Sequence, residues 1–334
     1  MPTTVRSFAK INIGLCIGPA RPDGFHELRT VYQTIESHDR ITVTVDAGTG
    51  IELRCAAPGV PLNDTNTCWR IVELALTRLG ISGRVRIEIE KSLPVQGGLG
   101  GASSNAVATL LALERELGRA LPVAEKLRLA AEVGSDLPLF LVGGTVLGVG
   151  RGEEVYPLPE LPSTVCVLAT PAIAVSTPRA FADWDGAQAQ GKLTAPAASV
   201  RINTFSSAVF SALNGVLSRQ DLEAGRFSSG VPGIECGGRA ETQLLDLVRT
   251  GMANDFETVV FPQHPELAQV KKILQAEGAL CASLSGSGSA VYGLFEAHAG
   301  AEKAAARLRK HGIGAQVTAT LTRRQYWEQL LVAE

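Results

Sequence analysis

The sequence has little net charge and no long apolar run. Its 31 lysines and arginines nearly balance 33 aspartates and glutamates, which gives a formal net charge of −2. Binding to a nucleic-acid backbone needs a basic face, so this balance argues against a nucleic acid as the main partner. The apolar stretch at residues 137–150 is interrupted by glycines and falls short of the roughly 20 residues of a membrane-spanning helix. Residues 1–15 also lack the apolar segment of a signal peptide, so we expect a soluble, cytoplasmic protein with no membrane partner.

The six cysteines form no metal-binding pattern. They are scattered along the chain, with no CxxC pair and no cysteine–histidine cluster. Such spacing is typical of free thiols in a reducing compartment and argues against zinc. We therefore expect mostly buried thiols and no metal site built from protein ligands alone.

The length of 334 residues favours two domains, because a single core stops growing near roughly 250–300 residues. Hydrophobic residues make up 45% and charged residues 19%, which is typical of a globular protein rather than a disordered one. Alternating strand patterns early in the chain and strand–helix pairs later predict an α+β fold. We expect an N-terminal domain over residues 1–165 and a C-terminal domain over 166–334, with a low-complexity insert at about 182–245.

Hydrophobic periodicity predicts the individual elements. Strands are expected at residues 5–17, 40–46, 51–55, 85–91, 145–149, 163–170, 280–284, 291–295 and 316–320. Helices are expected from an N-cap at Asn66 to about residue 79, from the glycine-rich stretch to about 117, and at 122–133, 208–217, 242–260, 264–277 and 299–311. Residues 21–28, RPDGFHEL, are expected to form a turn.

A glycine-rich stretch, PVQGGLGGASSN at residues 94–105, lies between a predicted strand and a predicted helix. Without Cβ atoms its N–H groups can approach phosphate oxygens closely, and the helix N-terminus adds free donors and a partial positive charge. Ser103 and Ser104 can cap that helix, or reach a phosphate or Mg²⁺. The stretch is not a Walker A loop, because no lysine precedes its serines, and Ser103 replaces the third glycine of a dinucleotide fingerprint. By itself it fits a glycine-rich turn packed on a helix equally well.

The order of residues in this stretch resembles the phosphate-binding motif of the GHMP kinase superfamily, which includes galactokinase and the homoserine and mevalonate kinases. A second glycine-rich segment, SLSGSGSAVYGLF at residues 283–295, resembles the superfamily's C-terminal glycine motif. Within the superfamily, the similarity is to the kinases of the non-mevalonate isoprenoid route. The segments that carry it are AKINIGL (9–15), RPDGFHEL (21–28), GSDLPLFLVGGTVLGVGRGE (134–153), PAIAVSTPRAF (171–181) and NDFE (254–257). The resemblance covers about residues 5–181 and 250–320, and Phe25 stands where those kinases usually have tyrosine.

The resemblance implies a two-domain fold and an ATP-dependent kinase. The N-terminal domain would be ribosomal-protein-S5-like and the C-terminal domain ferredoxin-like, with the active site between them. The implied reaction is phosphorylation by ATP of the C2 hydroxyl of a cytidine-diphosphate-linked sugar alcohol, with Mg²⁺ carried by ATP. We expect a monomer or weak homodimer. The ATP-binding residues implied are Asn66, Lys91, Pro94, Gly97, Gly98, Leu99, Gly100, Gly101, Ala102, Ser103 and Ser104.

Asp136 and Lys10 are the catalytic residues that the resemblance implies. Asp136 would accept the proton of the attacking hydroxyl, although a lone aspartate in such a segment is more often a turn or cap residue. Lys10 would hold Asp136 ionised, because an opposite charge nearby favours the charged form. A lysine that reaches solvent from an edge strand is an equal alternative. In the same way, Asn66 also fits an ordinary N-cap and Lys91 a solvated strand end.

The resemblance also implies residues that bind the acceptor. Phe25 and Phe181 would stack on the cytosine from opposite sides, with His26 beside them. Thr177 would hydrogen-bond near the diphosphate, and Asn12 would hold the polyol or the cytidine end. In the second glycine turn, the residues implied are Ser285, Gly286, Ser287 and Gly288. Taken alone, Phe25 also fits a packed ring and His26 a surface histidine. Thr177 also fits a helix cap, and Asn12 a solvated strand residue. The residues of the second glycine turn also fit a tight connection.

Three other functions stay open. One is a GHMP-type kinase with mevalonate or homoserine as its acceptor. Another is a noncatalytic nucleotide-binding regulator, whose expected mark is loss of the aspartate or the lysine. A third is a nicotinamide-dependent oxidoreductase that uses the glycine loop, against which the broken fingerprint argues.

Overall fold

Two β-sheets organise the chain in the computed structural model, which describes residues 2–191 and 253–332. The first sheet contains β1 (Thr3–Ala20), β2 (His26–Asp46), β3 (Gly50–Cys55), β4 (Arg84–Glu90), β5 (Thr145–Val149) and β6 (Glu154–Pro157). The second contains β7 (Val165–Thr170), β8 (Cys281–Leu284), β9 (Val291–Phe295) and β10 (Gly314–Ala319). The helices are α1 (Thr67–Leu79), α2 (Gly101–Leu117), α3 (Val123–Val133), α4 (Leu137–Phe140), α5 (Thr177–Ala189), α9 (Glu257–Gln263), α10 (Pro265–Ala276), α11 (His298–Lys310) and α12 (Arg323–Leu330).

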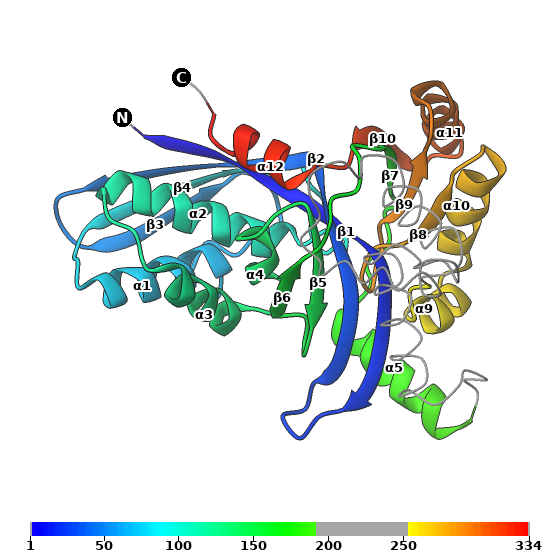
Figure 1. The fold of residues 1–334 in the computed structure, drawn as a ribbon, viewed down its shortest axis with the longest axis horizontal. Coiled ribbons are helices and arrows are strands. Elements are labelled where there is room, and N and C mark those ends of the chain that lie inside the picture. Colours follow the sequence, from blue (N-terminus) through cyan, green and yellow to red (C-terminus); the bar gives the residue numbers. More distant parts are fainter. Residues whose placement is uncertain (1, 192–252, 333–334) are drawn as a thin grey trace, which may run out of the picture.

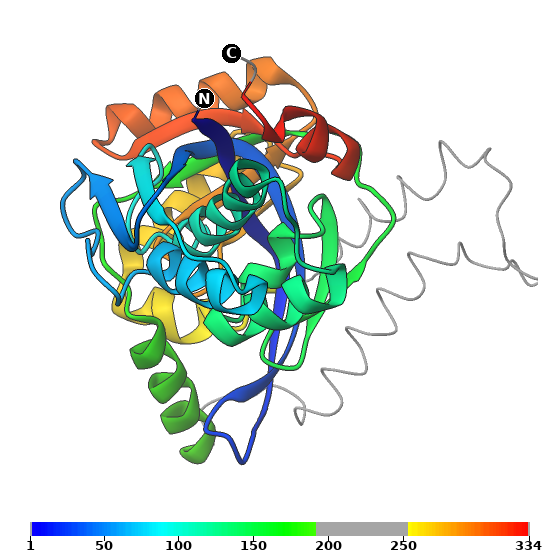
Figure 2. The same ribbon diagram turned by 90° about the vertical axis from the view of Figure 1, so that its left-hand side faces the viewer.

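The first sheet buries one face under helices. Along β4 the residues alternate strictly, with Val85, Ile87 and Ile89 buried and the charged residues between them exposed, as the period of two in a strand requires. Helices α1, α2 and α3 lie together on one side of this sheet (Figures 1 and 2). The alanine-rich α2 packs against both β1 and β2, so the helix that follows the glycine loop is anchored deep in the domain.

The long β1–β2 hairpin connects the two halves of the molecule. Its strands are 18 and 21 residues long, and their pairing is irregular at three places. Val5 and Phe8 belong to the core under the first sheet, whereas Leu15 and Ile17 pack in the core of the second. The tip of the hairpin lies beside α5 in both views (Figures 1 and 2). The strand that carries Lys10 is therefore held by both cores.

The second sheet is antiparallel, with the order β10-β7-β9-β8. Helices lie between β7 and β8 and between β9 and β10 in the chain, whereas β8 and β9 follow one another directly. This βαββαβ order is the ferredoxin-like arrangement that was expected. The last helix, α12, returns to the first half, where the ring of Tyr326 packs on Phe8. The predicted domain division at residues 165/166 stays a prediction, since β1 contributes to both cores and α12 packs beside β1.

Most predicted elements within the described residues are confirmed, but several predictions were wrong in detail. Strand β2 begins at His26 rather than at residue 40, because residues 30–35 are all buried and so lack the alternation that marks a half-exposed strand. Strand β6 and helices α4 and α12 were not predicted. Ser103 and Ser104 do not cap α2, whose N-cap is Gly100, and they lie inside the helix.

Some predictions fall wholly or partly outside the described residues. These are the helix at 208–217, the first part of the helix at 242–260, and most of the insert at about 182–245. Within the described part, α5 continues past residue 182 to Ala189, and α9 begins only at Glu257. No helix among residues 2–191 and 253–332 has the length and apolar character needed to cross a membrane.

Candidate active site

The glycine loop between β4 and α2 is shaped by close contact with the second glycine turn. Gly98 and Gly100 adopt φ values of 73° and 68°, which only glycine adopts without strain. A Cβ on Gly98 would lie 2.1 Å from the carbonyl oxygen of Ser285. The Ser285 hydroxyl in turn donates to the Gly98 carbonyl at 2.9 Å. The second turn thus packs behind the first, as predicted, and both must be nearly free of side chains.

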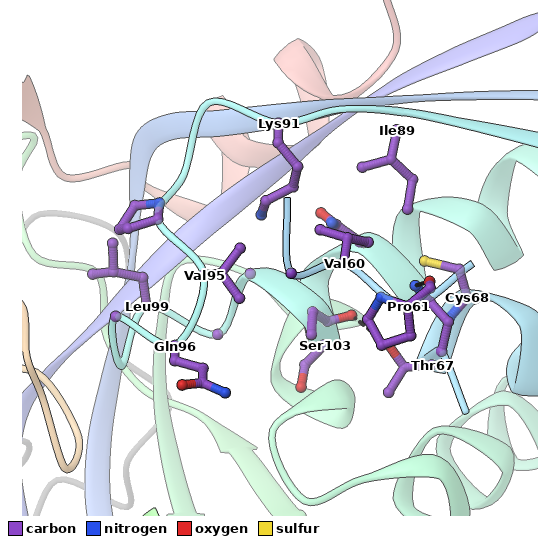
Figure 3. Close-up of a pocket in the computed structure, with 18 of the residues that line it drawn as sticks. Val60, Pro61, Thr67, Cys68, Ile89, Lys91, Val95, Gln96, Leu99 and Ser103 are labelled. Atoms are coloured by element: carbon purple, nitrogen blue, oxygen red, sulfur yellow. Dashed lines mark hydrogen bonds between the residues drawn. The ribbon is translucent and has the colours of Figure 1, made fainter. Parts of the chain in front are cut away.

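A first cavity of about 340 Å³ lies between this loop and the start of α1 (Figure 3). In Figure 3, Lys91 points into the cavity from the end of β4, Val95 and Gln96 border it on the loop side, and Thr67 and Cys68 on the α1 side. No side chain caps α2, so its first backbone N–H groups face the loop without a side-chain acceptor. The predicted ATP-binding residues that line the first cavity are Asn66, Lys91, Pro94, Gly97, Gly98, Leu99, Gly100, Gly101, Ala102 and Ser103.

Ser104 lies outside the first cavity. Its side chain is buried, and its hydroxyl accepts a hydrogen bond of 2.8 Å from the hydroxyl of Ser7 on β1. Ser103, one residue earlier, is only half-buried and faces the cavity. Because successive residues of a helix point in different directions, Ser103 faces the cavity while Ser104 faces the sheet.

Asn66 and Lys91 combine structural contacts with their position in the first cavity. Asn66 caps α1, with its side-chain oxygen accepting from the Cys68 N–H at 2.8 Å. Lys91 is not a solvated strand end, because its ammonium lies 2.5 Å from the buried carboxylate of Asp39. The other oxygen of Asp39 accepts the backbone N–H groups of Ser92 and Leu93, both at 2.8 Å. Asp39, which sequence reasoning missed, thus fixes the chain where it enters the glycine loop.

A second cavity of about 660 Å³ lies on the other side of the loop. It shares Gly98, Gly100 and Ser103 with the first cavity, so the glycine loop forms part of the wall of both. Lys10 and Asp136 both line the second cavity. A group bound along the loop from the first cavity would therefore face these two residues.

Lys10 and Asp136 form the charged centre of the second cavity. The Lys10 ammonium lies 3.6 Å from the Asp136 carboxylate, and it donates to Asn12 Oδ1 at 2.6 Å and to the Gly98 carbonyl at 2.8 Å. Burial lowers the pKa of Lys10, and the charge of Asp136 opposes this effect. Asp136 stands at the N-cap position of α4, but its side chain caps nothing and remains one third exposed. Lys10 is therefore not an edge lysine that reaches solvent, and Asp136 is not a capping aspartate.

The far end of the second cavity is aromatic. Phe181 stacks on His26, with ring centroids 5.0 Å apart and planes 12° apart. His26 Nε2 forms a hydrogen bond of 2.7 Å with Asp185 on α5, which ties the hairpin to that helix. Phe25 is 48% exposed and lies under the guanidinium of Arg151, 4.8 Å from its centroid. Phe256 also lines this end and packs edge-on against Phe181. His26 and Phe181 are thus already stacked, whereas Phe25 is open.

The second glycine turn contributes to the second cavity only in part. Gly286 and Ser287 line it, and Ser287 shares a hydrogen bond of 2.7 Å with Thr177, the first residue of α5. Ser285 and Gly288 lie behind, toward the glycine loop, and do not line it. The other predicted acceptor residues that line this cavity are Asn12, Phe25, His26, Thr177 and Phe181.

Sequence reasoning missed several residues that shape the second cavity. The Tyr32 hydroxyl donates to Asp136 Oδ1 at 3.0 Å. The side-chain amide of Asn254 donates to the carbonyls of Leu284 and Gly286, which holds the second turn in place. Arg151 lies in a segment that carried the resemblance, but its type alone did not single it out. No local pattern marks Tyr32, because its partner lies 104 residues further along the chain.

Comparisons with known proteins agree with this geometry. The family model described as GHMP kinases N terminal domain matches residues 66–144, and that described as GHMP kinases C terminal matches residues 240–314. A 4-diphosphocytidyl-2-C-methyl-D-erythritol kinase of Solibacter usitatus is 37% identical over 293 residues, which are 87% of this chain and 80% of that protein.

Solved structures give the same picture. A crystal structure of 4-(cytidine 5'-diphospho)-2C-methyl-D-erythritol kinase superposes with a TM-score of 0.67 at 28% identity, covering 96% of this chain and 99% of that one. A homoserine kinase from Cytophaga hutchinsonii superposes with a TM-score of 0.69 at 21% identity, covering 96% and 95%. At that identity the second likeness concerns the fold alone.

Proposed function

The chain belongs to the family of 4-diphosphocytidyl-2-C-methyl-D-erythritol kinases, which are GHMP kinases, and from this premise we propose how its two cavities perform the reaction. The enzyme transfers the γ-phosphoryl group of ATP to the C2 hydroxyl of 4-diphosphocytidyl-2-C-methyl-D-erythritol, a step of non-mevalonate isoprenoid synthesis. The observation that carries the proposal is the shared glycine wall. ATP on one side of it and the acceptor on the other would meet beside Lys10 and Asp136.

ATP would bind in the first cavity with its phosphates along the glycine loop. Backbone N–H groups at the start of α2 donate to the phosphate oxygens, and the helix dipole adds favourable charge. Glycine at positions 98 and 100 keeps this approach free of side chains. Lys91, held by Asp39, adds a cation near the first residue of α2. The loop thus binds phosphate chiefly through its backbone.

Mg²⁺ would be held mainly by the phosphates. Among the residues that the structure describes, no group of three or more acidic, histidine or cysteine side chains could hold a metal. Ser103 borders both cavities, and its hydroxyl would join the coordination of Mg²⁺. When bound, the ion supplies charge neutralisation for the phosphoryl group.

Asp136 would act as the proton acceptor. The C2 hydroxyl loses its proton to Asp136 as its oxygen bonds to the γ-phosphorus, and the bond to the β–γ bridging oxygen breaks to release ADP. Lys10 stabilises negative charge at the same point. Asn12, which accepts a hydrogen bond from Lys10, would orient the polyol.

The aromatic end favours a nucleotide-linked acceptor over a small one. Phe25 offers an open ring face to a base beside the stacked pair of His26 and Phe181, and base stacking is worth about 1–3 kcal/mol in nucleic-acid sites. Mevalonate and homoserine have no ring to place there. Thr177 and Ser287 lie between this end and the glycine loop, where a diphosphate would pass.

A comparison of three acceptors, each assayed separately, tests the proposal. ADP release would be followed with Mg-ATP and, in turn, 4-diphosphocytidyl-2-C-methyl-D-erythritol, mevalonate and homoserine, with an acceptor-free reaction as the control. We expect turnover above the control only with the cytidine-linked alcohol. Faster turnover with either small acceptor would assign another kinase of the superfamily. A monomeric or weakly dimeric state and a cytoplasmic location remain predictions.

A further inference from the structure

We propose that Tyr32 is a positioning residue for Asp136, fixing the orientation of the carboxylate that receives the proton. The role rests on the proposed kinase reaction and deepens it. Tyr32 belongs to none of the motifs singled out in the sequence. Its position in the first half of β2 brings it into contact with both charged residues of the second cavity.

Tyr32 contacts both residues of the charged centre. Its hydroxyl donates to Asp136 Oδ1 at 3.0 Å, while Oδ2 lies 3.6 Å from the Lys10 ammonium. The same ammonium sits over the Tyr32 ring, 5.7 Å from its centroid. Each carboxylate oxygen therefore has its own partner, and rotation of the carboxylate would break one contact or both.

The Tyr32 hydroxyl is held in its donating form. The residue is buried, and burial together with the neighbouring negative charge of Asp136 raises the pKa of Tyr32 well above its ordinary value. The charged groups that face it are Asp136 at the start of α4, Lys10 on β1 and Glu153 in the turn between β5 and β6. A protonated phenol can only donate to a carboxylate, so the hydrogen bond keeps one direction.

Two glycines form a slot for the Tyr32 side chain. A Cβ on Gly148, inside strand β5, would lie 2.4 Å from Cε2 of the ring. A Cβ on Gly152 would lie 2.5 Å from the hydroxyl oxygen itself. Glycine inside a strand commonly marks a close approach, and here the approaching group is this ring. The absence of side chains at Gly148 and Gly152 thus leaves the room that the phenol occupies.

The variant Tyr32→Phe removes only the hydroxyl and tests the role. Hydrogen bonds to charged groups are among the stronger ones, so we expect kcat to fall roughly 10- to 100-fold. The KM for ATP should stay unchanged, because Tyr32 does not line the first cavity. The acid limb of the kcat–pH profile should move to higher pH, because a donor that stabilises the ionised carboxylate is lost.

Tyr326→Phe is the matched control. The Tyr326 hydroxyl is equally buried and donates to the Phe140 carbonyl at 2.7 Å, but it contacts neither Lys10 nor Asp136. This variant should lose some stability and keep the wild-type pH profile. A loss of kcat in Tyr32→Phe of less than twofold, or an acid limb that does not move, would overturn the proposal.

A second variant displaces the Tyr32 ring from the side of β5. Gly148→Ala pushes the ring without touching Asp136, and it should reproduce the fall in kcat with an unchanged KM for ATP. Wild-type kcat and KM for ATP in Gly148→Ala would contradict the slot. All variants are assayed with whichever acceptor the wild-type enzyme phosphorylates. An enzyme that prefers mevalonate or homoserine would thus refute the substrate assignment, and the Tyr32 comparison would still be decided.

Discussion

At the scale of residues, the site depends on a lysine that is kept out of water. Lys10 is 3% exposed, and its ammonium is satisfied by a side-chain amide oxygen, a backbone carbonyl and a carboxylate. Desolvation is the larger influence on its pKa and lowers it, while Asp136 works in the opposite direction. The partners thus offset only part of the desolvation penalty of Lys10. Its pKa stays lowered, and the free energy of unfolding therefore depends on pH.

Replacing Lys10 separates its proposed catalytic role from its effect on stability. For Lys10→Met we expect kcat to fall by about 100-fold or more, as when one preorganised electrostatic group is removed. The pKa of Lys10 is lower in the folded chain than in the unfolded one, so between the two values the unfolded state binds more protons. The free energy of unfolding of the wild type should therefore rise with pH, relative to the variant, as pH approaches about 10.4 from below. Urea unfolding across that window measures the difference, and a constant difference would contradict the assignment.

At the scale of elements, two glycine-rich turns from different sheets shape each other. The first enters α2, the second connects β8 to β9, and the Gly98 carbonyl accepts from both Ser285 and Lys10. The backbone of the glycine loop is thus tied to Lys10 on one side and to the second turn on the other. A side chain between the turns would disturb both together.

The pair Gly98→Ala and Gly118→Ala tests this coupling. Both glycines have positive φ, so each variant meets left-handed backbone strain of roughly 1–2 kcal/mol. Only at position 98 does the new Cβ collide with backbone, at 2.1 Å from Ser285 O, whereas nothing lies within 4 Å at position 118. We expect the KM for ATP to rise about tenfold or more in Gly98→Ala and to stay near wild type in Gly118→Ala. Equal KM values in the two variants would show that the contact between the turns is dispensable.

At the scale of the whole molecule, the proposed active site lies along β1, where this strand passes from the core of the first half to that of the second. Strand β1 enters the first core at Val5 and the second at Leu15, and Lys10 and Asn12 lie between them. Asn254, which contacts the last residue of β8, pairs with Leu15 and holds the second glycine turn. The relative position of the two halves therefore determines how the two cavities meet at the loop.

Much of this arrangement could be predicted from local patterns. The strict alternation of β4, the glycine-to-helix transition and the cap at Asn66 act over a few residues, so they appear directly in the sequence. The early half of β2 was missed because Thr30 and Gln33 are buried polar residues whose partners come from distant segments. Tyr32 and Asp39 were missed for the same reason, since each acts on a residue that only tertiary folding brings near.

The measurement that tests the central claim most directly is ³¹P NMR of the enzyme with Mg-ATP and 4-diphosphocytidyl-2-C-methyl-D-erythritol, run beside Asp136→Asn. This substitution keeps the size of the side chain and removes its ability to accept the proton. The account predicts a new phosphomonoester signal together with ADP for the wild type, and formation at least about 100-fold slower in the variant. An equal rate in the two proteins would contradict the role of Asp136, and a wild type that forms no phosphomonoester would contradict the proposed reaction.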